Sequence, residues 1–262
     1  MRDRWVALCY HDVLPSTTAA GGGPQRFDVP LASFELMLDT IAASGFRGCS
    51  VADALAAPGT PRVAITFDDG NAGQFEHAAP ALRARGMSAT FYVTTDWVGR
   101  PGFVTWDQLR QLKAWGMSVQ SHSRSHPFLS ELGAEDLRRE LTESRARIDA
   151  ELSQTTTEIA FPGGDPPARS LRRLLREAGF TVALGTRWGM NGDGASDPLR
   201  PLKRCTVRGV TDRAWAERVI AGDAVLSIQN WPRESLLRSV RSSLGPTRYS
   251  RWRRWLLDRV SR

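Results

Sequence analysis

Short apolar runs of the β type alternate with amphipathic helical runs along most of this sequence. The apolar runs lie at 5–10, 63–67, 89–94, 118–121, 158–161 and 181–184, with a shorter one at 202–207. Neighbouring strands that are separated by helices pair in parallel, because the helix carries the chain back to the starting edge of the sheet. The alternation therefore predicts an α/β fold with a parallel sheet of about seven strands, either closed into a barrel or doubly wound.

Capping residues and glycines mark the ends of the expected helices. Ser33 is a candidate N-cap for a helix that ends at Gly45, and Thr105 is a candidate N-cap for a helix that carries Leu109 and Leu112. Further helices are predicted near 78–85 and at 134–152, 168–178 and 212–221.

The net charge of +7 is confined to the C-terminal end of the chain. Residues 231–262 hold nine arginines against two acidic residues, whereas residues 1–230 carry 26 basic and 26 acidic groups. A neutral body offers no extended basic surface, so we expect no nucleic-acid partner. We divide the chain into a body at 1–225 and a basic extension at 226–262.

The extension has the pattern of an amphipathic helix. It carries two apolar stripes at helical spacing, with arginines on much of the opposite sides. The first stripe is Leu236, Leu237, Val240 and Leu244, and the second is Tyr249, Trp252, Leu256 and Val260. Such a segment either lies in an anionic membrane interface or packs on the body with its arginines in water.

Cysteine usage and hydropathy indicate a soluble chain in a reducing compartment. Cys9, Cys49 and Cys205 show no C-x-x-C spacing, which argues against both a disulfide framework and a thiolate zinc site. No apolar run approaches the roughly 20 residues of a membrane span, and the N-terminal run is shorter than the roughly 7–15 residues of a secretory signal. The expected location is the cytoplasm, either free or peripheral on the inner face of the membrane.

Ionisable residues follow three of the predicted strands. The strand at 5–10 runs into His11 and Asp12, the strand at 63–67 into Asp68 and Asp69, and the strand at 118–121 into His122 and His126. The carboxyl ends of parallel strands meet at one face of the sheet, where active sites of such folds lie. We therefore expect these residues to form one site.

The residue types favour a metal centre. Adjacent carboxylates at Asp68 and Asp69 repel each other unless a cation compensates them. Two histidines four residues apart, together with one carboxylate, leave positions open on a bound ion for water and substrate. Such an ion lowers the pKa of its water to near neutrality, and the second aspartate is then free to act as a base. Two histidines and a carboxylate also describe iron(II) oxygenases, which is the alternative enzyme class.

Two motifs resemble those of a known family. T-F-D-D-G at 66–70 and H-S-x-x-H at 122–126 are similar to the first two motifs of the polysaccharide deacetylases, carbohydrate esterase family 4. The resemblance spans about residues 5–221. It implies an irregular (β/α) barrel of about seven strands and metal-dependent removal of N- or O-acetyl groups from sugars.

The resemblance also assigns roles to the two motifs. It implies that Asp68 is the general base, that Asp69 is the metal-binding carboxylate, and that His122 and His126 are the histidine ligands. The expected cofactor is a divalent metal, with Zn²⁺ first and other divalent ions as alternatives.

A third motif is present in a variant form. A-F-P-G-G at 160–164 resembles the family motif without the arginine that holds the base, and Arg204 is our candidate substitute. Phe161, Pro162 and Gly163 are implied to bind substrate. Gly163 stands where an aromatic residue is commoner, so one wall of the groove is expected to be open. Trp188 is a further candidate wall, because aromatic faces suit sugar rings.

The usual late motif, a leucine followed by the histidine acid, is absent: the nearest segment, 225–230, reads V-L-S-I-Q-N. L-C-Y-H-D at 8–12 instead resembles a permuted subgroup that includes the poly-N-acetylglucosamine deacetylases. In a barrel the first and last strands are neighbours, so the acid can come from either. The resemblance implies that His11 is the general acid and that Asp12 orients it.

The expected function is a metal-dependent hydrolase that removes an N-acetyl group from a saccharide or glycoconjugate containing N-acetylhexosamine. Two alternatives stay open. One is a deformylase or deacetylase of a lipid-linked sugar at the membrane face, and the other is a non-catalytic carbohydrate-binding relative.

Overall fold

The computed structural model describes residues 4–16, 27–192, 197 and 200–223. The basic extension at 226–262 and its two apolar stripes lie outside the described residues. Within these described residues the main sheet contains nine strands, which are β1 (Arg4–Tyr10), β4 (Arg47–Cys49), β5 (Arg62–Phe67), β6 (Thr90–Val93), β7 (Ser118–Ser121), β8 (Glu158–Ala160), β9 (Val182–Leu184), β10 (Asn191–Gly192) and β11 (Cys205–Thr206).

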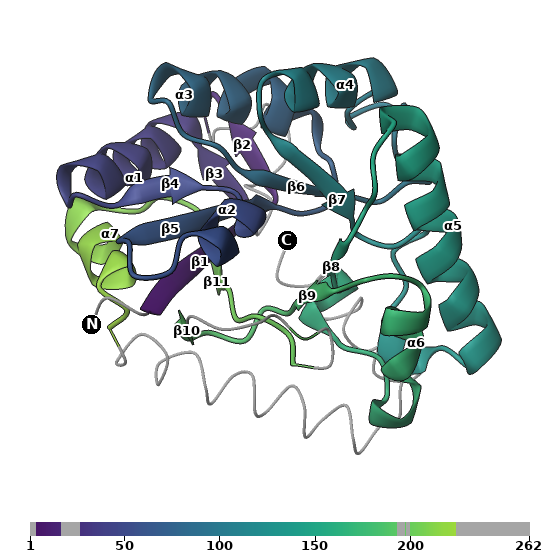
Figure 1. Cartoon of the computed structure of the whole chain (residues 1–262). Coiled ribbons are helices and arrows are strands. Elements are labelled where there is room, and N and C mark those ends of the chain that lie inside the picture. Colours follow the sequence, from purple (N-terminus) through teal and green to yellow (C-terminus); the bar gives the residue numbers. More distant parts are fainter. Residues whose placement is uncertain (1–3, 17–26, 193–196, 198–199, 224–262) are drawn as a thin grey trace, which may run out of the picture.

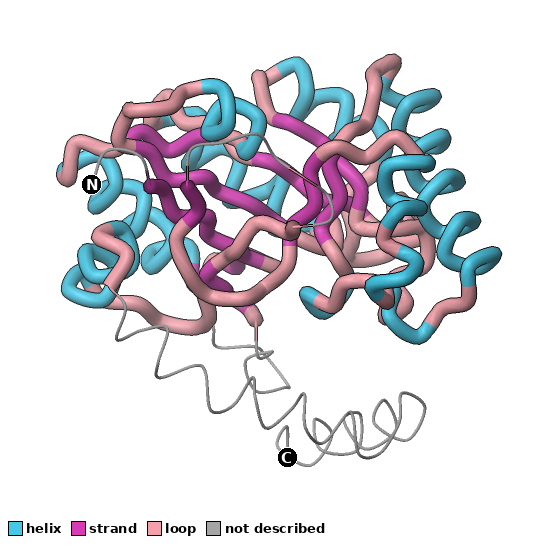
Figure 2. The backbone as a smooth tube through the Cα atoms, turned by 60° about the horizontal axis from the view of Figure 1, so that its bottom comes forward, coloured by secondary structure: helices cyan, strands magenta, loops and turns pink. Residues whose placement is uncertain are grey.

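Helices cover the outer side of this sheet (Figures 1 and 2). The α-helices are α1 (Leu31–Ala43), α2 (Val51–Ala56), α3 (Ala79–Ala84), α4 (Trp106–Ala114), α5 (Ala134–Leu152), α6 (Arg173–Glu177) and α7 (Arg213–Ile220). A π-turn, η1 (Gln74–Ala78), leads into α3, and three short 3₁₀ turns are η2 (Leu129–Glu131), η3 (Pro162–Gly164) and η4 (Arg169–Leu171).

The sheet is parallel and curled, as Figure 1 shows. Strands β1, β5, β6, β7, β8 and β9 pair in parallel in that order, and β10 adds an antiparallel strand beside β1. Leu202 bridges to Leu184 at the end of β9, and β11 then pairs with β1, so the segment 202–206 joins the two ends of the sheet. The expected irregular (β/α) barrel is confirmed in this curled form.

Alternation along the strands separates the outer core from the barrel interior. Val6, Leu8 and Tyr10 of β1 belong to the largest hydrophobic cluster, which includes side chains of the covering helices, while Trp5 and Ala7 belong to a second cluster. Successive side chains of a strand point to opposite faces. Cys9 therefore faces the interior with Trp5 and Ala7.

Aromatic packing fixes the strand ends from which the predicted site emerges. The ring of Phe67, the last residue of β5, stacks on Phe91 of β6 at 4.7 Å between centroids and on Tyr10 of β1 at 5.5 Å. The backbone N–H of Asp68 donates to the Tyr10 carbonyl oxygen at 2.9 Å. These contacts hold the ends of β1 and β5 side by side.

Several helix predictions agree closely with the structure, and others are corrected. Thr105 caps α4 with a complete capping box, which satisfies two backbone N–H groups that would otherwise lack a partner. Ser33 is not a cap: α1 begins at Leu31 after Pro30, and the buried Ser33 Oγ accepts from the Thr211 N–H. The pairing of β3 (Asp28–Pro30) with β2 (Asp12–Leu14) sets the earlier start.

The sequence analysis did not predict β4 and α2. Both are short, which weakens any periodic signal, although Ser50 and Asp53 give a cap pattern: the Ser50 Oγ accepts from the Asp53 N–H at 3.1 Å. Among the described residues, no helix has the length and hydropathy that crossing a bilayer requires.

Candidate active site

Three predicted metal ligands meet at the carboxyl ends of β5 and β7. Asp69 follows β5 in the turn before η1, His122 directly follows β7, and His126 lies one short turn further on. The Asp69 Oδ1 atom is 3.4 Å from the Nε2 atom of His122 and 3.3 Å from the Nε2 atom of His126. Two ligands of a tetrahedral ion at about 2.0–2.1 Å stand about 3.3 Å apart. The spacing therefore fits a shared cation.

Strained backbone holds these ligands. Asp69, Ser123 and His126 all have positive φ angles, of 76°, 66° and 65°. Residues other than glycine adopt this region at a cost of about 1–3 kcal/mol each, and such strain clusters at functional sites. The Ser123 Oγ accepts from the His126 N–H, and the Asp69 carbonyl accepts from the Thr94 N–H, which stabilises the two turns.

Two further features of the Asp69, His122 and His126 ligand atoms fit a bound metal ion. The buried Asp69 Oδ1 atom accepts no hydrogen bond among the described residues, which leaves a carboxylate lone pair to be satisfied. The Nδ1 atom of His122 lies 2.8 Å from the Ala160 carbonyl oxygen. A carbonyl only accepts, so Nδ1 carries a proton, and Nε2 is the nitrogen that faces Asp69 and that a cation would bind in place of a proton. The stacked ring of Trp97, 4.8 Å from that of His126, supports the second histidine.

The charges of this cluster are strongly coupled. Burial by itself would raise the pKa of Asp69, but the two neighbouring imidazoles outweigh it and hold the pKa well below its usual value. Burial would lower the pKa of His122, but the carboxylates of Asp68 and Asp69 reverse the direction and raise it. Asp69 is therefore ionised, as a metal ligand must be.

Asp68 is held by the arginine that the sequence analysis proposed. Arg204, which is fully buried, donates from Nη1 to Asp68 Oδ1 at 2.6 Å and from Nη2 to Asp68 Oδ2 at 2.7 Å. The guanidinium also donates to the Gly185 carbonyl oxygen and to the Thr66 hydroxyl. Burial would raise the pKa of Asp68, yet Arg204 keeps it below its ordinary value. Asp68 is thus an ionised carboxylate in a fixed orientation.

Replacing Arg204 with methionine is expected to cost about 3–5 kcal/mol of folding free energy, because it leaves the buried Asp68 carboxylate without a partner. Asp68→Asn is expected to cost a similar amount by stranding Arg204. The double variant removes both charges, so its loss should be clearly smaller than the sum of the two. Urea unfolding of the three variants measures this, and additive losses would show that the pair does not act as a unit.

His11 lies next to Asp68 at the end of β1. Its carbonyl oxygen accepts from the side-chain amides of Gln74 at 2.6 Å and Asn71 at 3.0 Å, and the same Gln74 amide donates to the Asp68 carbonyl. The imidazole packs on the Phe27 ring, and its buried Nδ1 atom has no hydrogen-bond partner in the described part of the chain. Burial lowers the pKa of His11, with the Asp69 and Asp68 carboxylates opposing the shift.

The Asp12 carboxylate contacts the backbone of Val13 and the turn at Gly73, whereas the sequence predicted a contact with His11. Its Oδ1 atom accepts from the Val13 N–H at 2.9 Å and approaches Gly73 so closely that a Cβ there would lie 2.4 Å away. Burial raises the pKa of Asp12 to about 7. Within the described part of the chain, no hydrogen bond joins Asp12 to the His11 imidazole. The carboxylate therefore ties β2 to the turn before η1, and the expected orienting contact is not formed.

The predicted substrate-binding residues fall into two groups. Phe161 and Pro162 are buried, and Trp188, at 9% exposure, packs in the largest hydrophobic cluster, so these three side chains belong to the packed interior. Gly163 is exposed, but its side-chain position is not open space: a Cβ there would lie 2.5 Å from the Phe128 ring. Phe128, from the loop after β7, thus stands where an aromatic at 163 was expected.

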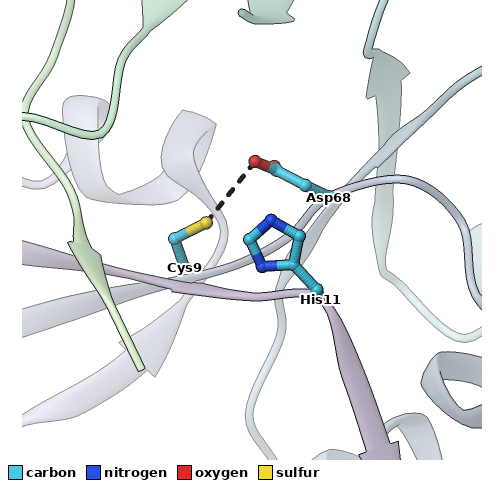
Figure 3. Close-up of side chains that lie close together, drawn as sticks. All are labelled: Cys9, His11 and Asp68. Atoms are coloured by element: carbon cyan, nitrogen blue, oxygen red, sulfur yellow. Dashed lines mark hydrogen bonds between the residues drawn. The ribbon is translucent and has the colours of Figure 1, made fainter. Parts of the chain in front are cut away.

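Sequence reasoning missed Phe128, Gln74 and Cys9. The Cys9 thiol donates to Asp68 Oδ2 at 3.4 Å from the interior face of β1 (Figure 3). Strand alternation, which places Cys9 on the face opposite Leu8 and Tyr10, is a signal that could have found it. Gln74 and Phe128 lie in turns, where no periodic pattern predicts which way a side chain points.

Comparisons with known sequences agree on one family. Residues 56–183 match a family model described as polysaccharide deacetylase. YxkH of Bacillus subtilis (strain 168), which carries the name of a polysaccharide deacetylase, is 26% identical over 188 residues, or 70% of this chain and 64% of that protein. The chain thus spans about 64% of the length of this curated relative.

Solved structures share the fold. The deacetylase PplD of Streptococcus pyogenes, in complex with acetate, superposes with a TM-score of 0.73 at 22% identity, covering 84% of this chain and 99% of that chain. The polysaccharide deacetylase BC0361 of Bacillus cereus gives 0.72 at 20%, covering 83% and 69%. IcaB of Ammonifex degensii gives 0.64 at 25%, covering 82% and 97%.

Proposed function

Because this chain carries a polysaccharide deacetylase domain, we propose that it is a metal-dependent hydrolase. Its substrate is an N-acetylhexosamine unit of a saccharide or glycoconjugate, from which it removes the N-acetyl group. The observation that carries the proposal is the convergence of the Asp69, His122 and His126 ligand atoms beside an ionised aspartate.

Asp69, His122 and His126 would hold the ion, for which Zn²⁺ is the first choice because its usual ligands are histidine nitrogens and carboxylates. When bound, a divalent metal supplies Lewis acidity, which activates water and polarises an acyl carbonyl. The proton transfers are assigned to side chains of the protein.

Asp68 is positioned to take the proton of the attacking water. Its Oδ2 atom accepts from both Arg204 and Cys9, whereas, among the described side chains, only Arg204 donates to Oδ1. Each carboxylate oxygen offers about two lone pairs, so Oδ1 keeps one free and is the proposed proton acceptor. The Arg204 pair orients that lone pair and keeps the carboxylate ionised.

His11 is positioned to protonate the departing amine. The hydrogen bonds from Gln74 join the backbones of His11 and Asp68, so the acid and the base are held at a fixed separation. General acid–base catalysis requires both groups within reach of the reacting atoms, and the proposed acid and base follow two neighbouring strands, which supports these roles.

A substrate panel tests the proposal. The purified full-length chain is analysed for metal, stripped with a chelator and reloaded, and assayed for acetate and formate release. Free, nucleotide-linked and lipid-linked amino sugars and N-acetylglucosamine oligomers form the panel. We expect acetate release that is lost with the metal and returns with it. Sugar binding without release would favour the non-catalytic relative, and formate release would favour the deformylase.

We further propose that the protein works in the cytoplasm and that its extension at 226–262 attaches it to the inner membrane face, near a lipid-linked sugar. The proposal is supported by the charge of +7 beside two apolar stripes. Each arginine near an anionic surface contributes on the order of 1 kcal/mol, and buried tryptophan and leucine add to it.

Full-length protein is accordingly expected to sediment with vesicles that contain anionic lipid and to be released from them by salt. It should not bind vesicles made of neutral lipid. A chain ending near Ala221 should stay in the supernatant and keep its activity on short soluble sugars. If the shortened chain unfolds, as judged by circular dichroism, the extension packs on the barrel and the membrane proposal fails.

A further inference from the structure

Cys9, His11 and Asp68 form a second group of metal-binding side chains beside the first. Each offers one ligand atom, and the three atoms lie within 4.8 Å of one another. Figure 3 shows the three side chains pointing toward one another from β1 and the end of β5. The proposed reaction uses His11 and Asp68 but assigns nothing to the Cys9 thiol, which is fully buried.

The spacing of this group suits a cation that binds sulfur. The Cys9 Sγ atom is 3.4 Å from Asp68 Oδ2. A tetrahedral zinc ion with a sulfur ligand at about 2.3 Å and an oxygen ligand at about 2.0 Å sets these two atoms about 3.5 Å apart. The His11 ligand atom lies within 4.8 Å of the Cys9 and Asp68 ligand atoms, and Figure 3 shows the imidazole beside both. A small inward shift of the imidazole would complete a three-ligand set at the zinc distances.

We propose that Cys9, His11 and Asp68 form a second, inhibitory site for a thiophilic divalent cation such as Zn²⁺ or Cd²⁺. One bond forms between the cation and Sγ, and one bond, between Sγ and its proton, breaks. The proton leaves to solvent, and no electron is transferred.

The cation would occupy the place of the thiol proton between Sγ and Oδ2. The two hydrogen bonds from Arg204 approach the Asp68 oxygens separately and can persist, so Asp68 need not be pulled from its partner. The positive guanidinium nevertheless disfavours a cation nearby, and a buried thiol must give up its proton. The second site is therefore weaker than the Asp69 site, whose carboxylate forms no ion pair with an arginine among the described residues.

A cation at this second site would inhibit the deacetylase reaction because of which residues it binds, and this part of the proposal rests on the proposed function. A cation on Asp68 and His11 occupies both the proposed base and the proposed acid. Excess Zn²⁺ should stop turnover after the first ion has activated it. Binding of the second ion does not depend on the reaction, so it can be tested separately from catalysis.

Cadmium titration of metal-free, full-length protein tests the site, because a cadmium–thiolate bond gives an ultraviolet charge-transfer band. The first equivalent should bind at Asp69, His122 and His126 without the band. The second should produce the band in the wild type and not in Cys9→Ser. Cys205→Ser is the matched control: Cys205 is also buried, on β11 beside β1, but belongs to neither ligand group among the described residues, and should keep the band.

The inhibition constant for a second Zn²⁺ should rise at least about 10-fold in Cys9→Ser, measured against that variant's own activity. Cys9→Ala serves as a second variant if serine disturbs the strand, with uptake of the first equivalent as the check on folding. A second equivalent that gives no band in the wild type, or a band that survives in Cys9→Ser, would overturn the site. A band without deacetylase activity would keep the site and reject the proposed function.

Discussion

Replacing Asp68 with asparagine is expected to lower kcat by about 10²–10⁴-fold while the protein still binds about one metal ion per chain. The amide cannot take a proton from water, but it leaves Asp69, His122 and His126 untouched. Metal analysis and steady-state kinetics on one preparation measure the two effects. Since Asp68→Asn strands the buried Arg204, the assay temperature must lie below the melting transition of the variant.

Asp69→Ala, His122→Ala and His126→Ala should behave in the opposite way. Each removes an atom of the ligand triad, so metal affinity should fall by at least about 100-fold and activity with it. Loss of metal from Asp68→Asn, with retention in Asp69→Ala, would mean that the two aspartates exchange roles.

His11→Ala should also retain its metal while losing turnover by about 10²–10⁴-fold. The loss should be greatest for substrates whose amine is a poor leaving group, because these depend most on protonation. A comparison of N-acetyl sugars with an activated acetyl ester, whose leaving group needs no proton, measures this dependence. The ester should be hydrolysed with a much smaller loss.

His77→Ala is the control for this prediction. His77 is the one remaining histidine of the sequence; it lies in η1 and belongs to neither ligand group among the described residues. It should leave kcat and metal content unchanged. If His11→Ala kept the wild-type rate on N-acetyl sugars, the assignment of the acid to the N-terminal Y-H-D segment would be wrong.

Much of the architecture follows from local patterns. The strands β5 and β7 and the helix α5 lie where apolar alternation and helical spacing predict them, and Thr105 caps α4. Short elements such as β4 were not predicted, since three residues are too few to show a periodic pattern of apolar side chains. The helix α1 begins at Leu31 and not after Ser33, because the chain enters it directly from β3 and the φ angle of Pro30 is fixed by its ring.

The candidate site divides in the same way. The residues that end parallel strands share one face of the sheet, so the meeting of His11, Asp68 and His122 could be predicted without coordinates. The burial of Phe161 and Trp188 could not, because the same aromatic residue suits a groove or a core, and only packing distinguishes them.

The sequence by itself determined the parallel α/β fold, the strand ends that carry the ionisable residues and the confinement of excess charge to residues 231–262. Only the tertiary structure decided that Gln74 joins the backbones of His11 and Asp68, that Phe128 fills the space above Gly163, and that the Cys9 thiol meets the base. Periodicity reports which face of an element a residue occupies. Which side chains then touch depends on the curl and register of the sheet, and these arise from the packing of the whole barrel.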